Sequence, residues 1–152
     1  MQKTLQLNFP EYKFNVVERG QNKQIFDSIR RKYVALTPEE WVRQNLLQFL
    51  VTEKKYPPML ISVETHINLN GLSRRCDAVV NGRNGKPVML IECKAPLETI
   101  SQKTFDQAGR YNLITKVKWL LVSNGINHFC AETDAANQRF NFVKEIPFYE
   151  EL

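Results

Sequence analysis

Two residues of opposite charge follow an apolar run near the middle of the chain. The segment VMLI, residues 88–91, is typical of a strand that is buried on both faces. Glu92 and Lys94 come next, two positions apart, so their side chains lie on the same face of an extended chain. Charged side chains are rarely buried unless they are paired or bound to something. The pair therefore indicates either a structural ion pair or a site with a chemical task.

A second carboxylate is expected beside this pair. The segment RRCDAVVN predicts a strand that contains Asp77, and GRNGK predicts the hairpin turn that joins it to the strand ending at Glu92. Two carboxylates at one sheet end repel each other unless a cation lies between them. A magnesium or manganese ion fits this need, because it takes one or two carboxylates and completes its shell with water and phosphate oxygens.

Two neighbouring groups extend this interpretation. The backbone carbonyl of Cys93 is a candidate further metal ligand. Lys94 is placed to orient a water or to stabilise charge that develops on a phosphate. An ion-pair cluster at a sheet edge, with no catalytic role, explains the same residues, and their spacing does not decide between the two.

The surrounding pattern predicts an α/β protein. LTPEEWVRQNLLQFL is typical of a helix with Thr37 as its cap and Pro38 at its first position. Three strands follow, LISVETHINLN, RRCDAVVN and PVMLIECK, and their tight connections predict an antiparallel meander. The remaining elements are a helix (TISQKTFDQAGRYNLIT, capped by Thr99 or Ser101), an apolar strand (KVKWLLVSNG) and a final hairpin (HFCAETD and RFNFVKEI). This order predicts a mixed central sheet flanked by helices.

We expect a single domain over residues 1–152, because the length suits one core. Residues 1–36 would form an N-terminal arm, 37–125 the core and 126–152 a C-terminal β extension.

The first helix supplies a third candidate carboxylate. At about 100° per residue, Glu39 falls on the same side as the apolar residues of this helix, whereas Glu40 lies further round. We therefore expect Glu39 to point toward the sheet and toward the metal, with Glu40 facing solvent. The alternative is that both glutamates only complement the helix dipole.

Gln107 and Tyr111 lie four residues apart in the second predicted helix and so share one face. Arg110 and Lys103 add positive charge near them. A surface that contacts nucleic acid explains this arrangement. A hydrogen-bonding helix pair with Tyr111 in the core explains it too.

Positive charge is concentrated between Leu72 and Lys118. This window holds nine Lys or Arg against four Asp or Glu, which accounts for the whole net charge of +5. A local basic field suits a partner that carries phosphates, and an ordinary solvated surface is the alternative. Arg74 and Arg75, just before Asp77, would either contact a nucleic-acid backbone or end the sheet in solvent.

These segments resemble a known group of enzymes. Asp77 followed by Glu92-Cys93-Lys94 resembles the D…(D/E)xK signature of the PD-(D/E)XK superfamily, which has the restriction-endonuclease-like fold. Gln107 and Tyr111 resemble the QxxxY element of RecB-like nucleases and of the R-subunit nucleases of type I restriction systems. LTPEEWVRQNLLQFL resembles the helix that brings an acidic residue to such sites. The resemblance runs from about residue 32 to residue 125 and is nearest to small proteins similar to the N-terminal domain of the type I R subunit.

The resemblance implies a metal-dependent deoxyribonuclease that acts on DNA with Mg²⁺ or Mn²⁺. It assigns the catalytic work to Asp77, Glu92, Lys94 and Gln107, and the metal to Asp77, Glu92, Glu39 and the carbonyl of Cys93. Together with the charge pattern, it leads us to expect nucleic-acid contacts from Tyr111, Arg110, Arg74, Arg75 and Lys103. A homodimer, or a separate motor or partner protein, is also expected. The alternative is a non-catalytic nucleic-acid-binding or assembly module that keeps the fold.

Several classes of protein are not expected. No apolar run approaches the roughly 18 residues of a membrane span, and the first residues lack a leader pattern, so we expect a cytoplasmic protein without a membrane partner. Three cysteines and two distant histidines suggest neither a disulfide framework nor a zinc site. The sequence contains no GxxxxGK[ST] phosphate loop, so we do not expect a motor within this chain.

Overall fold

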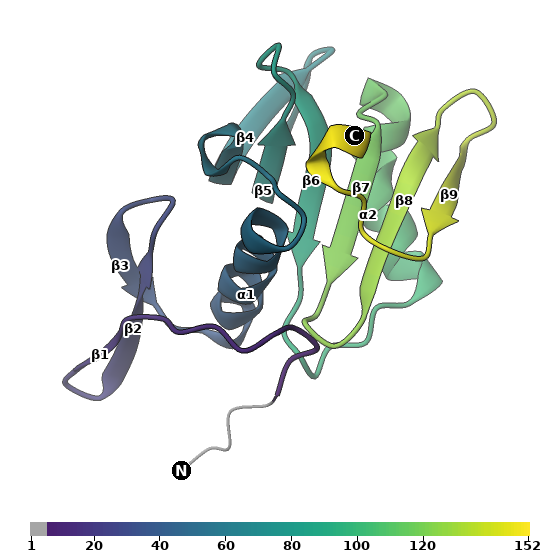
Figure 1. The fold of residues 1–152 in the computed structure, drawn as a ribbon. Helices are drawn as coiled ribbons and strands as arrows, with labels where there is room; N and C mark the ends of the chain where they lie inside the picture. Colours follow the sequence, from purple (N-terminus) through teal and green to yellow (C-terminus); the bar gives the residue numbers. More distant parts are fainter. Residues whose placement is uncertain (1–5) are drawn as a thin grey trace.

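The computed structural model describes residues 6–152, which form two β-sheets, two α-helices and two short 3-10 turns (Figure 1). The N-terminal sheet contains β1 (Val16–Arg19), β2 (Asn22–Asp27) and β3 (Lys32–Ala35). The helices are α1 (Pro38–Thr52) and α2 (Gln102–Thr115), and the 3-10 turns are Pro58–Leu60 and Tyr149–Glu151. The large sheet contains β4 (Ile61–Leu69), β5 (Leu72–Asn81), β6 (Pro87–Cys93), β7 (Trp119–Ser123), β8 (His128–Asp134) and β9 (Arg139–Val143).

The large sheet has the strand order β4-β5-β6-β7-β8-β9. Neighbouring strands are antiparallel except β6 and β7, which are parallel because α2 carries the chain back across the sheet between them. The meander, the crossover helix and the final hairpin confirm the mixed sheet that the sequence predicts. The third strand of the predicted meander is one residue shorter than expected, because β6 ends at Cys93 and leaves Lys94 just beyond it.

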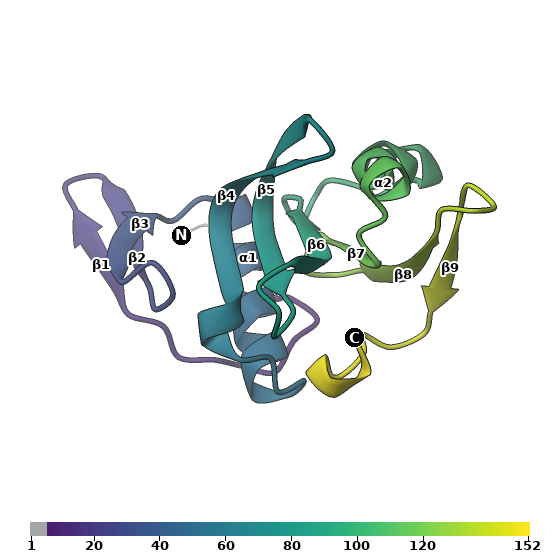
Figure 2. The same cartoon turned by 90° about the horizontal axis from the view of Figure 1, so that it is seen from above.

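The two helices cover opposite faces of this sheet (Figure 2). On the face of α1, buried residues such as Leu46 and Leu50 pack against Ile91 and Leu121 of the sheet. On the face of α2, Phe105 packs with Leu90 and other sheet residues. Burial on both faces explains why β6 and β7 are almost entirely apolar.

Both helices begin where their sequences predict a cap. The hydroxyl of Thr37 accepts a hydrogen bond from the backbone N–H of Glu40, 3.1 Å away, and Pro38 occupies the first turn of α1. Ser101, and not Thr99, caps α2 by accepting a 3.1 Å hydrogen bond from the N–H of Thr104. These caps fix which side chains of each helix face the sheet.

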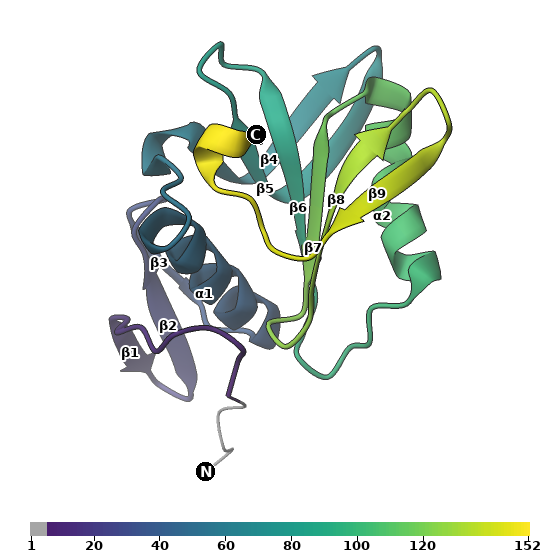
Figure 3. The same cartoon turned by 45° about the vertical axis from the view of Figure 1, so that its right-hand side comes forward.

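The N-terminal segment forms a sheet of its own that lies beside α1 (Figure 3). Ile25 and Asp27 on β2 are buried, so this sheet has a packed face. Leu7 belongs to the core on the α1 face and packs so closely on Gly125 that a Cβ atom there would lie 2.7 Å from its side chain. No helix within residues 6–152 has the length and apolar character needed to cross a membrane.

Candidate active site

The site forms where β5 and β6 separate. Ladder pairs join the two strands only as far as Ala78 and Ile91. At the next position the carboxylate of Asp77 accepts a 2.7 Å hydrogen bond from the backbone N–H of Cys93. The side chain of Asp77 therefore bridges the gap and is held beside the backbone that carries Glu92 and Lys94. The strand pairing thus confirms that Asp77 approaches the segment that contains Glu92.

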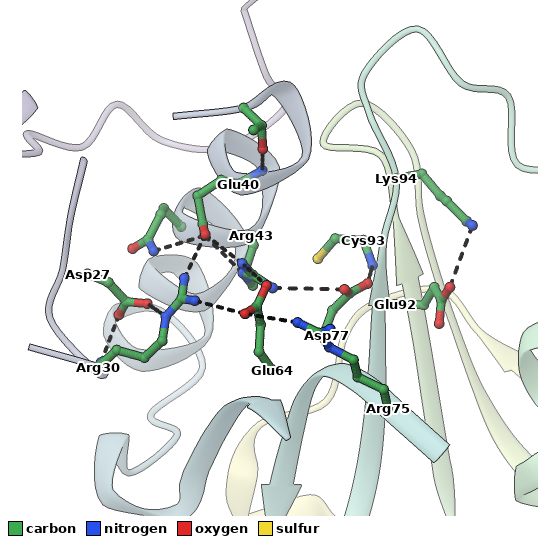
Figure 4. Close-up of polar contacts among 12 residues, drawn as sticks. Asp27, Arg30, Glu40, Arg43, Glu64, Arg75, Asp77, Glu92, Cys93 and Lys94 are labelled. Atoms are coloured by element: carbon green, nitrogen blue, oxygen red, sulfur yellow. Dashed lines mark hydrogen bonds and ion pairs between the residues drawn. The ribbon is translucent and has the colours of Figure 1, made fainter. Parts of the chain in front are cut away.

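Glu92 and Lys94 lie on the same side of the chain, as their spacing predicts. The Lys94 ammonium is 3.5 Å from Oε1 of Glu92 (Figure 4). The guanidinium of Arg74 is 2.6 Å from the other oxygen, Oε2. The backbone N–H of Lys94 donates to the carbonyl of Ser123, 2.8 Å away, so β7 holds the residue although it lies outside β6.

Asp77 points the other way, toward α1. Its Oδ1 lies 3.8 Å from a guanidinium nitrogen of Arg43, and Figure 4 shows the two side chains facing each other. Arg43 in turn donates two hydrogen bonds to the carboxylate of Glu40, at 2.9 and 2.5 Å, and lies 3.2 Å from Glu64 of β4. Arg43 therefore connects the first helix to both β4 and β5.

The same network reaches the N-terminal sheet through Arg30. Arg30 donates a 2.6 Å hydrogen bond to Glu40 and also pairs with the buried Asp27 and with Glu64. Sequence patterns alone did not predict that these carboxylates and arginines form one network. One signal was available, because Glu40, Arg43 and Gln44 recur at helical spacing and so share one side of this amphipathic helix.

The expected orientation of the two helix glutamates was wrong. Glu40 is buried, with 5% exposure, whereas Glu39 is exposed. A helical wheel that counts only apolar residues places Glu40 in solvent. Glu40 can nevertheless be buried, because Arg30 and Arg43 neutralise its charge. Glu39 still lines the cavity in which Asp77 lies, so its expected place near a metal remains available.

A cavity of about 420 Å³ separates the N-terminal sheet from the end of β5. Three cationic side chains and four carboxylates line it, so its charged lining is negative by one unit. The lining residues are Arg30, Lys32, Tyr33, Val34, Ala35, Thr37, Glu39, Glu40, Arg43, Glu64, Asp77 and Cys93. A bound divalent cation would reverse the sign of this lining and make it attractive to a phosphate.

The carboxylates of the cavity differ in their electrostatic environment. Burial raises the pKa of Asp77, the hydrogen bond from Cys93 only partly offsets this effect, and the nearby charge of Glu92 adds to it. Burial acts in the same direction on Glu40, but the hydrogen bonds from Arg43 and Arg30 outweigh it and lower the pKa. Glu40 is thus a neutralised structural anion, whereas Asp77 lacks enough positive charge nearby.

The donor chemistry fits a hard cation, because the available groups are carboxylate oxygens. The side chain of Cys93 belongs to the core on the α1 face, which leaves only its backbone for a ligand role. Within residues 6–152, no three His, Cys, Asp or Glu side chains are already gathered around one point. Glu92 is turned toward Arg74 and Lys94, so it would have to reorient to join Asp77 at a metal.

Helix α2 presents a polar face that includes three of the expected residues. Lys103, Gln107 and Arg110 are exposed at helical spacing, so all three are accessible to a partner. Arg75 is also largely exposed, with 62% of its side chain accessible, and lies 3.2 Å from Glu64.

Tyr111 does not share this exposure. It is 8% exposed, and its hydroxyl donates to the carbonyl of Leu72 at 3.1 Å and accepts from the N–H of Leu69 at 3.2 Å. Both capacities of the hydroxyl are therefore used in holding the β4–β5 turn against α2. This arrangement contradicts the expectation that Tyr111 contacts nucleic acid and agrees with the alternative that places it in the core.

The sequence from residue 38 to residue 147 matches the family described as type I restriction enzyme R protein N terminus (HSDR_N). The chain belongs to this family. The match begins at α1 and extends beyond β9, so it includes Asp77, Glu92 and Lys94 but not the N-terminal sheet. No curated protein matches the sequence.

Two solved structures are similar to this family member. The first is the fragment structure of a protein assigned as the HsdR subunit of a type I restriction enzyme from Vibrio vulnificus YJ016. It has 19% identity and a TM-score of 0.53, with coverage of 77% of this chain and 24% of that fragment. This chain thus spans about a quarter of the fragment.

The second is a DUF820 protein from Anabaena variabilis ATCC 29413, provisionally described as a nuclease, with 14% identity and a TM-score of 0.49. The similar region covers 90% of this chain and 88% of the Anabaena chain. The family and the first structure agree on the fold. The protein therefore has the restriction-endonuclease-like fold that the sequence predicts.

Proposed function

We propose that the protein is a metal-dependent deoxyribonuclease that hydrolyses phosphodiester bonds of DNA. The observation that carries this proposal is the hydrogen bond from Cys93 to Asp77, which holds one carboxylate beside the backbone segment that carries Glu92 and Lys94. Membership of the restriction R-protein family and the restriction-endonuclease-like fold support it.

In this proposal Asp77 and Glu92 bind Mg²⁺ or Mn²⁺, with Glu39 and the carbonyl of Cys93 as further ligands. The metal, when bound, polarises the phosphate and lowers the pKa of a bound water. Lys94 holds the attacking water in place and stabilises the negative charge that develops on the phosphate. Gln107 contacts the substrate at the reacting phosphate.

The substrate strand would lie along the basic face of the molecule. Lys103 and Arg110 of α2 and Arg75 of β5 are exposed and would contact the phosphate backbone, which positions a strand without reading its sequence. We further propose a cytoplasmic location, and action as a homodimer or with a separate motor or partner protein.

Metal binding tests the proposal without requiring turnover. The melting temperature should rise with millimolar Mn²⁺, because a ligand that binds only the folded state stabilises it, by about 2.7 kcal/mol at 100 times its dissociation constant. Asp77→Asn should abolish this rise. Asp106→Asn, an exposed change on α2 distant from the cavity, should retain it. An equal rise in Asp77→Asn and wild type would refute the assignment.

A non-catalytic nucleic-acid-binding or assembly module is the second candidate. The pairing of Glu92 with Arg74 and Lys94 favours it, because this carboxylate is satisfied without any metal. Such a module would bind DNA in a salt-dependent manner, and Asp77→Asn would leave that binding unchanged.

A further inference from the structure

Arg74 makes two contacts that connect Glu92 to helix α2. One guanidinium nitrogen lies 2.6 Å from Oε2 of Glu92, and another donates a hydrogen bond to the backbone carbonyl of Ala108. Both charged side chains are only about a fifth exposed, at 20% for Arg74 and 23% for Glu92. The ion pair is thus sheltered from solvent and anchored at one end by the helix backbone.

Glu92 is satisfied on both of its oxygens. Lys94 lies 3.5 Å from Oε1, and Arg74 occupies Oε2. A cation that takes Glu92 as a ligand must therefore compete with Arg74 for the carboxylate. Asp77 faces no comparable competitor, because its nearest guanidinium nitrogen, on Arg43, is 3.8 Å away. Formation of a metal site therefore requires the ion pairs of Glu92 to break.

Arg74 also lies at the surface where a substrate phosphate would arrive. Its anchor, Ala108, is next to Gln107, and Gln107 shares an exposed face with Lys103 and Arg110. A guanidinium binds phosphate with the same two-pronged geometry that it uses for carboxylate. A phosphate on this face could replace Glu92 as the partner of Arg74 while the bond to Ala108 persists.

We propose that Arg74 exchanges Glu92 for a phosphate of the nucleic acid, so that substrate binding frees Glu92 for the metal. This inference rests on the proposed function, since it takes Glu92 as a metal ligand. It makes Arg74 a positioning residue that couples the two binding events. Because such coupling is reciprocal, nucleic acid strengthens metal binding by the same factor by which metal strengthens nucleic-acid binding.

Calorimetric titration of the full chain with Ca²⁺, with and without a short DNA duplex, measures this coupling. Ca²⁺ takes the same oxygen ligands, and the duplex is checked for cleavage after each run. In wild type, DNA should tighten Ca²⁺ binding about tenfold. Arg74→Gln should bind Ca²⁺ about tenfold more tightly than wild type without DNA, and DNA should add little further.

Arg83→Gln is the matched control, because it removes the same charge from an arginine that contacts Glu150 and not Glu92. It should keep both the wild-type affinity and the effect of DNA. An Arg74→Gln variant with wild-type affinity, or with the full DNA effect, would overturn the inference. If this variant does not fold, Arg74→Lys should show a partial change, and wild-type behaviour in Arg74→Lys would overturn the inference as well.

Glu92→Gln separates this inference from the proposed function. If Glu92→Gln binds Ca²⁺ as wild type does, Glu92 is not a ligand and the proposed metal site fails. If Glu92→Gln loses Ca²⁺ binding but Arg74→Gln changes nothing, only the exchange fails.

Discussion

Asp77 and Cys93 are joined by a 2.7 Å hydrogen bond that takes the place of the next ladder bond between β5 and β6. Because the donor is a backbone group, the position of the carboxylate depends on the path of the strand and not on a mobile side chain. Glu92 and Lys94 flank that donor in sequence. One backbone group thus fixes the spacing of the three residues on which the proposed chemistry depends.

Substitution of the two glutamates at the start of α1 should change the stability of the protein by very different amounts. Glu40→Gln removes the anion that neutralises Arg30 and the nearly buried Arg43, so the free energy of unfolding should fall by about 3 kcal/mol. Glu39→Gln changes an exposed side chain and should alter stability by no more than about 0.5 kcal/mol. Urea unfolding of both variants measures the difference.

The Glu39→Gln variant also tests the role of this residue in metal binding separately from its role in stability. Glu39→Gln should reduce the stabilisation by Mn²⁺, because Glu39 lines the cavity of Asp77 and is a candidate ligand. Equal losses of stability in the two variants would contradict the different burial of these glutamates.

Substitutions of Tyr111 and Gln107 on α2 should likewise affect different properties, stability in one case and DNA affinity in the other. Tyr111→Phe leaves the N–H of Leu69 and the carbonyl of Leu72 without their side-chain partner, which should cost about 1–2 kcal/mol. Its affinity for DNA should not change. Gln107→Ala is exposed, so it should keep its stability and lose DNA affinity. Gel-shift titration with thermal unfolding distinguishes them, and a loss of DNA affinity in folded Tyr111→Phe would contradict the structural role of its hydroxyl.

Asp27 should make the stability of the protein depend on pH in the acidic range. Burial would raise the pKa of Asp27, but the hydrogen bonds of Arg30 and of the following backbone outweigh burial and hold it below the usual 3.8. A carboxyl whose pKa is lower in the folded state stabilises the fold above the unfolded pKa, and this contribution is lost as the pH falls through the folded value.

Asp27→Asn should therefore be less stable than wild type by about 3 kcal/mol at pH 7. The difference should shrink as the pH falls below about 4, because wild type loses the charged pair with Arg30. Unfolding in urea from pH 2.5 to pH 7 checks this. A difference that does not change with pH would mean that the charge of Asp27 is not what stabilises the N-terminal sheet.

Local patterns were enough to predict the core of the fold and the approach of Asp77 to the segment that contains Glu92. Period-two alternation, a hairpin turn and the apolar run before Glu92 identified β5 and β6, and their adjacency brought Asp77 toward that segment. These features depend on short stretches of chain, which is why they are readable without a structure.

The remaining features depend on contacts between distant segments. Arg30 belongs to the N-terminal sheet, and nothing near it in sequence indicates that it pairs with Glu40 on α1. The partners of the Tyr111 hydroxyl are backbone groups of a turn about 40 residues earlier. Periodicity also reports apolar burial only, so it assigned the buried Glu40 to solvent.

The most direct test of the central claim is cleavage of single- and double-stranded DNA with Mg²⁺ or Mn²⁺, comparing wild type with Lys94→Ala. Lys86→Ala, an exposed change in the β5–β6 turn, is the control. We expect metal-dependent cleavage by wild type and by Lys86→Ala, and a loss of at least 100-fold in folded Lys94→Ala, about the lower range for a positioned acid–base group. Equal cleavage by wild type and folded Lys94→Ala, or no cleavage by folded wild type with either metal, would contradict the account.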